Sequence, residues 1–107
     1  MMRTYEVRFL APALDDLIAL YRRIGEAAGA VMASGDLTRI EAACLGLELF
    51  PLRGAARDDI RPGLRTMGFE RRAVIVFLVE PRQVSVLRVF HGGQDFERIR
   101  RALGEAS

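Results

Sequence analysis

The stretch AVIVFLVEPRQVSVLRVF, residues 73–90, decides the fold of this 107-residue chain. Its first part, residues 73–79, is apolar without alternation, which predicts a central strand covered on both faces. The next four residues, EPRQ, are typical of a turn. Residues 84–90 are again rich in β-branched side chains, so the simplest arrangement is an antiparallel hairpin of two buried strands.

A strand and an amphipathic helix are predicted ahead of this hairpin. Residues 4–10 alternate polar and apolar side chains, which is typical of a half-buried strand. Pro12 suits the first turn of a following helix, and Gly25, after Arg22 and Arg23, suits its end. The apolar face of this helix repeats at helical spacing and consists of Leu14, Leu17, Ile18, Tyr21 and Ile24.

The segment 25–36 is compatible with two structures. Its alanines favour helix, whereas Gly29, Ser34 and Gly35 interrupt one. Ser34 or Asp36 is also a suitable cap for a helix that starts afresh. The sequence therefore predicts either helix or loop here.

A second helix, predicted for residues 37–50, carries two apolar stripes. One stripe is expected to pack in the core and consists of Leu37, Ile40, Cys44 and Leu47. At about 100° per residue, Leu45 and Leu49 fall on a different stripe, with two glutamates, Glu41 and Glu48, between the stripes. This second stripe needs either a partner protein or cover from within the chain, for which the candidates are Leu20, Ile24 and residues 25–35.

The remaining segments complete an α+β order. Pro51 ends the second helix, and residues 52–59 are expected to form a polar loop. Residues 60–67 contain a short strand, and their Pro-Gly pair favours either a sheet edge or a bulge. A Gly-Gly turn follows the last strand, and Asp95 can cap a short final helix. The order βααβββα predicts one domain, residues 1–107, with a mainly antiparallel sheet packed against a helical pair.

Composition argues against several kinds of chemistry. The chain has one cysteine, Cys44, and one histidine, His91, so we expect no internal disulfide, no ordinary metal site and no cofactor. Cys44 lies on the core stripe and is expected to be a small buried hydrophobe. The polar start and the short apolar runs predict neither a signal peptide nor a membrane span, and so a cytoplasmic protein.

The basic residues are unusual in kind but not in number. All 16 are arginine, yet the formal net charge is only +2. Arginine suits the recognition of phosphate and carboxylate groups. A balance of 16 basic against 14 acidic residues nevertheless argues against a purely electrostatic nucleic-acid binder.

Three segments carry a family resemblance: LFPLRG at 49–54, DIRPGLR at 59–65 and RVFHGGQD at 88–95. A leucine and proline that end the second helix, an Arg-Pro-Gly-x-Arg segment and a closing Arg-Val-Leu-His-Gly segment are typical of the ParE branch of the RelE/ParE toxin superfamily. The similarity covers nearly the whole chain. It departs from the family pattern at Phe90, where leucine is commoner, and at Gln94, where an arginine often precedes the aspartate.

The resemblance implies a function as the toxin of a type II toxin–antitoxin pair. It implies neutralisation by a ParD-like antitoxin from the same operon, and DNA gyrase as the usual target, with DNA contacted only through the antitoxin or gyrase. Such a toxin acts by binding rather than by catalysis. The antitoxin-contact candidates are Leu45 and Leu49, and the target-contact candidates are Arg61, Arg65, Arg88, His91, Arg98 and Arg101.

Two other functions stay open at this stage. A RelE-type ribosome-dependent mRNA endonuclease needs cationic and phenolic groups converging on one site, but the chain has no lysine, and its tyrosines, Tyr5 and Tyr21, both lie near the start. His91 is then either a general base or a structural or binding residue at a strand end. A non-toxic interaction domain is the third possibility.

The arginines of the predicted sheet also have two interpretations. The even spacing of Arg61 and Arg65 places them on one strand face. They and Arg88 either contact a partner or form salt bridges within the chain, for which the candidate acids are Asp58, Asp59 and Glu70.

Overall fold

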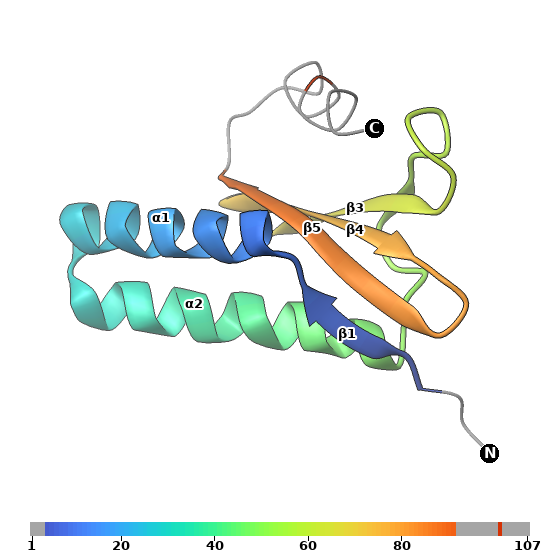
Figure 1. Cartoon of the computed structure of the whole chain (residues 1–107). Coiled ribbons are helices and arrows are strands. Elements are labelled where there is room, and N and C mark those ends of the chain that lie inside the picture. Colours follow the sequence, from blue (N-terminus) through green and yellow to red (C-terminus); the bar gives the residue numbers. More distant parts are fainter. Residues whose placement is uncertain (1–3, 92–100, 102–107) are drawn as a thin grey trace.

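The structure, a computed structural model, describes residues 4–91 and Arg101. Two helices follow the first strand and four strands follow the helices (Figure 1), which confirms the predicted α+β class. The predicted last helix, with Asp95 and Arg98, lies outside the described residues, as do Gly92, Gly93 and Gln94. The elements are β1 (Glu6–Phe9), α1 (Ala11–Ala28), α2 (Ala30–Leu45), the 3-10 turn η1 (Gly46–Glu48), β2 (Ala55–Ala56), β3 (Leu64–Phe69), β4 (Ala73–Val79) and β5 (Gln83–His91).

The strands form one mixed sheet in the order β1-β5-β4-β3-β2. β4 pairs antiparallel with β3 and with β5, which confirms the predicted hairpin. β1 lies parallel to β5, with Glu6 opposite Gln83 and Phe9 opposite Val86. A parallel pair needs a long connection, and the helices and the other strands supply it. β1 and β5 are thus neighbours although they are far apart in the sequence, and β1 lies at one edge of the sheet.

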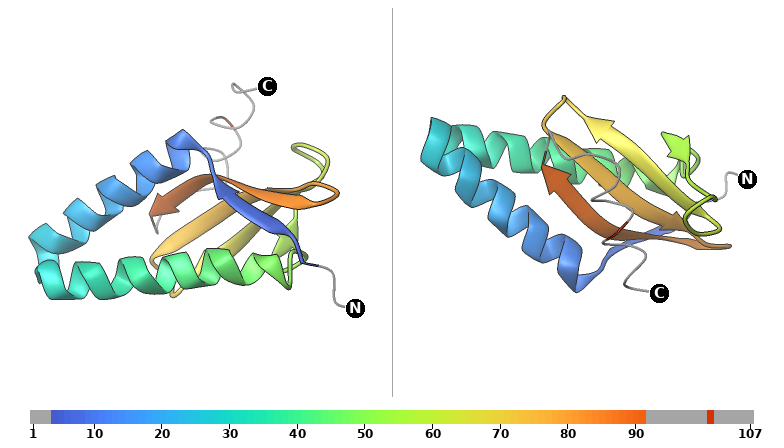
Figure 2. Two further views of the ribbon diagram at one scale, coloured as in Figure 1. Left: turned by 60° about the horizontal axis from the view of Figure 1, so that its bottom comes forward. Right: turned by 90° about the horizontal axis from the view of Figure 1, so that it is seen from above.

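The sheet is buried on both faces at its centre. Figure 2 shows the two helices diverging from their connection to form a V, with the sheet at its open end. On the helix side of β4, Ile75 and Phe77 pack with residues of α1 and α2. On the other side, Val76 packs with Leu64 and Leu87. The prediction of a central strand covered on both faces is therefore confirmed for β4.

The helices are longer than predicted and are separated by a single residue. α1 continues through Gly25 to Ala28, so the prediction that it ends before Gly25 is wrong. A Cβ placed on Gly25 would lie 3.9 Å from the Cβ of Ala33, which places Gly25 where the two helices approach closely. Gly29, with φ of +93°, makes the break. Among the described residues, no helix has the length and apolar character that a membrane crossing needs.

The second helix differs from the prediction at both ends. It begins at Ala30, so the ambiguous segment is helical apart from Gly29, and Asp36 lies inside the helix rather than capping it. It ends at Leu45, and η1 carries the chain on, so the prediction that it reaches Phe50 is wrong. Ile40, Cys44 and Leu47 are buried as expected, whereas Leu37 is only partly buried.

The thiol of Cys44 sits in this core and faces no solvent. Burial disfavours the thiolate and raises the pKa of Cys44 to about 12, with a smaller contribution from the negative charge of Glu41. A thiol that stays protonated at neutral pH is a poor nucleophile. The prediction that Cys44 is a small buried hydrophobe is confirmed.

The segment after the helices, predicted to be a loop, contains the two-residue strand β2. The guanidinium of Arg65 donates hydrogen bonds to the carbonyl oxygens of Arg53 and Leu52, both at 2.9 Å, and of Gly54 at 3.2 Å. These bonds tie the segment to β3. Gly54 has φ of +73°, and a Cβ on it would lie 2.1 Å from the Thr66 carbonyl oxygen. Only glycine fits this close approach.

We expect Gly54→Ala to lower the free energy of unfolding by about 2–3 kcal/mol, because the methyl group would push the segment away from β3 and break its hydrogen bonds. Gly68→Ala is the matched control, since a Cβ there meets nothing within 4 Å, and it should change stability by less than about 1 kcal/mol. Urea unfolding of both variants measures the difference. Equal changes in the free energy of unfolding for the two variants would show that the segment accommodates the Gly54→Ala methyl group without loss of stability.

Candidate functional site

An apolar surface follows the two helices and continues past the edge strand. We call it the helix–edge surface and define it by five partly or largely exposed side chains: Leu14, Ile18, Leu37, Leu45 and Leu49. Leu45 is 51% exposed and Leu49 44% exposed. The alternative that Leu20, Ile24 or residues 25–35 bury them is therefore wrong. Exposed apolar side chains that lie together commonly mark a binding surface.

Three hollows run along this surface. The first, of about 450 Å³, lies between the helices and is lined by Leu14, Leu17, Ile18, Tyr21, Leu37 and Glu41. The second, of about 670 Å³, brings β1 together with Leu45 and Glu48. The third, of about 420 Å³, shares Tyr5 with the second and reaches Leu49, Phe50 and Leu52. Leu37, Glu41 and Leu45 are four residues apart on α2, so they join the first hollow to the second along one helix face.

The edge of β1 borders the second hollow. The backbone N–H of Glu6 donates to the Arg82 carbonyl at 3.0 Å, and that of Leu10 donates to the Val86 carbonyl at 3.0 Å. In a parallel ladder alternate residues bond to opposite sides, so the backbone groups of Val7 and Phe9 point to the open side of the strand. An open edge of this kind is a template for pairing with another chain.

Arg88, a predicted target contact, has a structural partner on α1. Its guanidinium donates two hydrogen bonds to the Asp16 carboxylate, at 2.7 and 3.1 Å, and its charge lies 4.7 Å from the centre of the Phe90 ring. Asp16 also accepts a hydrogen bond from the Val89 backbone N–H at 2.9 Å. β1 pairs with β5 only at residues 83–86. Further along β5, the Asp16 carboxylate accepts the backbone hydrogen bond of Val89 that a neighbouring strand would otherwise accept. The hydrogen bond to Asp16 raises the pKa of Arg88 above its ordinary value.

The other strand arginines do not share one face. Arg61 lies before β3, so the prediction that it and Arg65 share a strand face is wrong. Arg65 is held by the loop carbonyls described above, while Arg61 is exposed. The acids proposed as mates for these arginines are used elsewhere, because Asp59 pairs with Arg57 and Glu70 with Arg39. Arg101 is exposed. Target contact by these residues stays a prediction.

His91 ends β5, where it pairs with Ala73 of β4. It lines a hollow that also contains Arg71 and Arg72. Neither tyrosine lines this hollow, because Tyr5 borders β1 and Tyr21 faces the groove between the helices. Within residues 4–91 and at Arg101, no three or more potential metal ligands lie together. The described residues thus do not bring the cationic and phenolic groups of a nuclease site together around His91.

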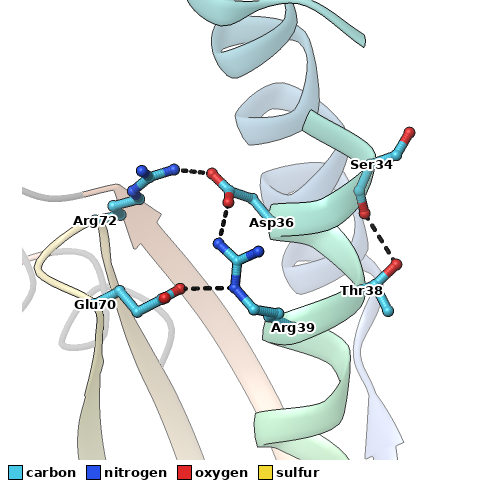
Figure 3. Close-up of polar contacts among 6 residues, drawn as sticks. All are labelled: Ser34, Asp36, Thr38, Arg39, Glu70 and Arg72. Carbon is cyan, nitrogen blue, oxygen red and sulfur yellow. Dashed lines mark hydrogen bonds and ion pairs between the residues drawn. The ribbon is translucent and has the colours of Figure 1, made fainter. Parts of the chain in front are cut away.

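A polar cluster that sequence reasoning missed joins α2 to the turn between β3 and β4 (Figure 3). Asp36 is fully buried, and its carboxylate accepts hydrogen bonds from both Arg39 and Arg72. Arg39 also pairs with Glu70 at 3.1 Å. The hydrogen bond to Glu70 is the main cause that raises the pKa of Arg39 above its ordinary value. The only signal in the sequence was a lone aspartate on the inner side of an alanine-rich helix.

Comparison with known proteins shows the family of this chain. The family model for the ParE toxin of the type II toxin–antitoxin system parDE matches residues 7–96. This chain belongs to the ParE toxin family. Its sequence is 36% identical to Toxin ParE3 of Caulobacter vibrioides over 81 residues, which cover 76% of this chain and 80% of that protein. The membership confirms the resemblance to ParE toxins and to the RelE/ParE superfamily.

Two solved structures share the fold of this ParE-family chain. The chromosomal ParDE toxin–antitoxin system from P. aeruginosa matches with a TM-score of 0.72 at 24% identity, covering 83% of this chain and 97% of that one. The toxin–antitoxin complex RelBE2 from Mycobacterium tuberculosis matches with a TM-score of 0.59 at 24% identity, covering 88% and 98%. At 24% sequence identity, these two matches show a shared fold.

The segments that carried the ParE resemblance have structural roles in this chain. LFPLRG, residues 49–54, supplies Leu49 of the helix–edge surface and the carbonyls that Arg65 holds. Arg65 itself closes DIRPGLR, residues 59–65. RVF, residues 88–90, supplies the ion pair to α1. In this ParE-family chain two of the motif arginines, Arg65 and Arg88, therefore hold the fold together.

Proposed function

We propose that this chain is a toxin neutralised by a ParD-like antitoxin at the helix–edge surface, and that it acts in the cytoplasm by binding and inhibiting DNA gyrase. The observation that carries the antitoxin site is the half-exposed pair Leu45 and Leu49 beside the open edge of β1. An amphipathic helix of the antitoxin fits the groove between α1 and α2. An extended segment that follows it fits the edge of β1.

The occupant proposed for this surface is a disordered tail of the antitoxin. The hollow beside β1 is lined by Arg82 together with Glu6 and Glu48, whereas the hollow beyond it has Arg53 and no acid among its described lining residues. Acidic residues on the tail would meet these arginines and would raise the rate of association more than the final affinity. A tail that folds on binding can cover a long surface of this shape.

Membership of the ParE family supports gyrase as the target and binding as the mode of action. The separation of His91 from both tyrosines also favours a binding inhibitor over a nuclease. The inhibitor would need no chemistry of its own, because blocking a step of the gyrase cycle is enough to arrest growth.

The test is a supercoiling assay with purified gyrase, relaxed plasmid and the purified chain. We expect inhibition or accumulation of cleaved DNA at micromolar chain, reversed when the ParD-like protein encoded beside it is added in equal amount. The same preparations are incubated with ribosomes and messenger RNA. Codon-dependent cleavage without any effect on gyrase would overturn the proposal in favour of a RelE-type endonuclease.

A further inference from the structure

The hollow beside His91, of about 420 Å³, lies where the end of α1 and the start of α2 face the β3–β4 turn. Its floor is aliphatic and includes Leu20, Ile24 and Met32. Its rim carries three arginines, Arg23, Arg71 and Arg72. We call it the arginine hollow. None of its lining residues lines the hollows of the helix–edge surface, so it is a separate surface.

The rim arginines differ in what balances their charge. Arg72 is held by buried Asp36 (Figure 3), and Arg39 and Glu70 complete a cluster whose formal charges cancel. In the part of the chain that the structure describes, neither Arg23 nor Arg71 forms an ion pair. Among the described residues, the hollow therefore presents two guanidinium groups without an ion-pair partner above an apolar floor, and Asp36 fixes the third guanidinium beside them.

The backbone conformation of the β3–β4 turn also supports a function for Arg71. Glu70 and Arg71 have φ of +46° and +59°, and the Arg72 N–H donates to the Phe69 carbonyl at 2.8 Å, so the hairpin closes with two left-handed residues. Glycine and asparagine adopt this conformation more easily than glutamate or arginine. The turn thus keeps Arg71 on the rim at some cost in strain, a pattern associated with functional positions.

We propose that the arginine hollow binds an acidic segment of a partner protein, with one apolar side chain of the segment on the floor and its flanking carboxylates on Arg23 and Arg71. Arginine forks pair well with carboxylates, and an apolar centre ringed by charge is the usual plan of a protein interface. Among the described lining residues, only His91 offers a ring on which a nucleic-acid base could stack, and the rest of the floor is apolar, which favours a protein segment over RNA or DNA. The inference goes beyond the antitoxin and gyrase proposals and depends on neither.

The probe is a synthetic peptide of about 12 residues, with one leucine flanked on each side by two glutamates in a Gly-Ser background. Methyl NMR of the full chain follows Ile24 and Met32 in the hollow, with Ile18 on the helix–edge surface as the reference. We expect saturable shifts at Ile24 and Met32 and none at Ile18. Replacing Arg23 by glutamine and Arg71 by asparagine should weaken binding by about 10-fold or more; asparagine tolerates the left-handed turn.

The matched control removes two arginines away from the rim, Arg22→Gln with Arg61→Gln, and should leave the affinity for the peptide unchanged. Three results would overturn the proposal: no shift at Ile24 and Met32 at millimolar peptide, equal binding of a peptide with lysines in place of the glutamates, or stronger shifts with a single-stranded oligonucleotide. The last result would assign the hollow to nucleic acid instead.

Discussion

Replacing Arg39 and Arg72 together by alanine is expected to lower the free energy of unfolding by about 3 kcal/mol, because it leaves the fully buried carboxylate of Asp36 without a charged partner. It also removes the link from α2 to the β3–β4 turn, since Arg39 no longer reaches Glu70. Urea unfolding at neutral pH, followed by circular dichroism, measures the loss.

The informative control neutralises the acid. Adding Asp36→Asn to the double arginine variant should restore part of the lost stability, because a buried neutral amide costs less than a buried unpaired charge. The double variant Arg22→Ala with Arg61→Ala removes two exposed arginines of the same kind and should change the free energy of unfolding by less than about 0.5 kcal/mol. A double arginine variant as stable as this control would show that water reaches Asp36 and that the cluster holds nothing together.

The hairpin and the helix faces could be predicted from the sequence because their signals are local. An uninterrupted apolar run over residues 73–79 gave a strand with the bounds that the structure shows. The period of α1 placed Leu17 correctly on its buried side. The parallel pairing of β1 with β5 has no local signal, since it depends on where two helices return the chain.

The helix boundaries failed for a tertiary reason. Gly25 looks like a helix end in isolation, yet it lies inside α1, where a Cβ would make ordinary contact with Ala33 of α2. Asp36 looks like a cap, yet it is a buried partner for Arg39, one turn further along α2, and for Arg72, which lies in the distant β3–β4 turn. Local preferences for glycine and aspartate were overridden in both places by contacts between helices and sheet.

In the candidate site, too, the features with a local sequence signal could be predicted and those that depend on long-range contacts could not. The exposure of Leu45 and Leu49 followed from helical periodicity, even though α2 ends at Leu45 and η1 carries the chain on to Leu49. The roles of the arginines were harder to predict, because charge alone does not show whether a guanidinium pairs with another group of the same chain or stays available to a partner. Arg65 and Arg88 have partners far away in the sequence, among loop carbonyls and on α1. Arg23 and Arg71, which line the arginine hollow, come together only through the fold.

If the proposed ParD-like antitoxin binds the helix–edge surface, the double variant Leu45→Glu with Leu49→Glu is expected to weaken its binding by about 100-fold or more. Each substitution places a charge in an interface that the antitoxin would otherwise keep free of water, at about 2 kcal/mol apiece. Both side chains are about half exposed in the chain alone, so the fold should tolerate the glutamates. Calorimetry with the purified antitoxin measures the affinity, after circular dichroism has shown that the variant is folded.

Val31→Glu is the matched control, because Val31 lies at the opposite end of α2, is 90% exposed and lines none of the three hollows of the helix–edge surface. It should leave the affinity for the antitoxin within about 2-fold of the wild type. Wild-type affinity in a folded double leucine variant would place the antitoxin on another face. A double variant that fails to fold, while each single variant folds and binds normally, would equally count against the helix–edge surface, because it would show that the two leucines stabilise the chain and do not contact the antitoxin.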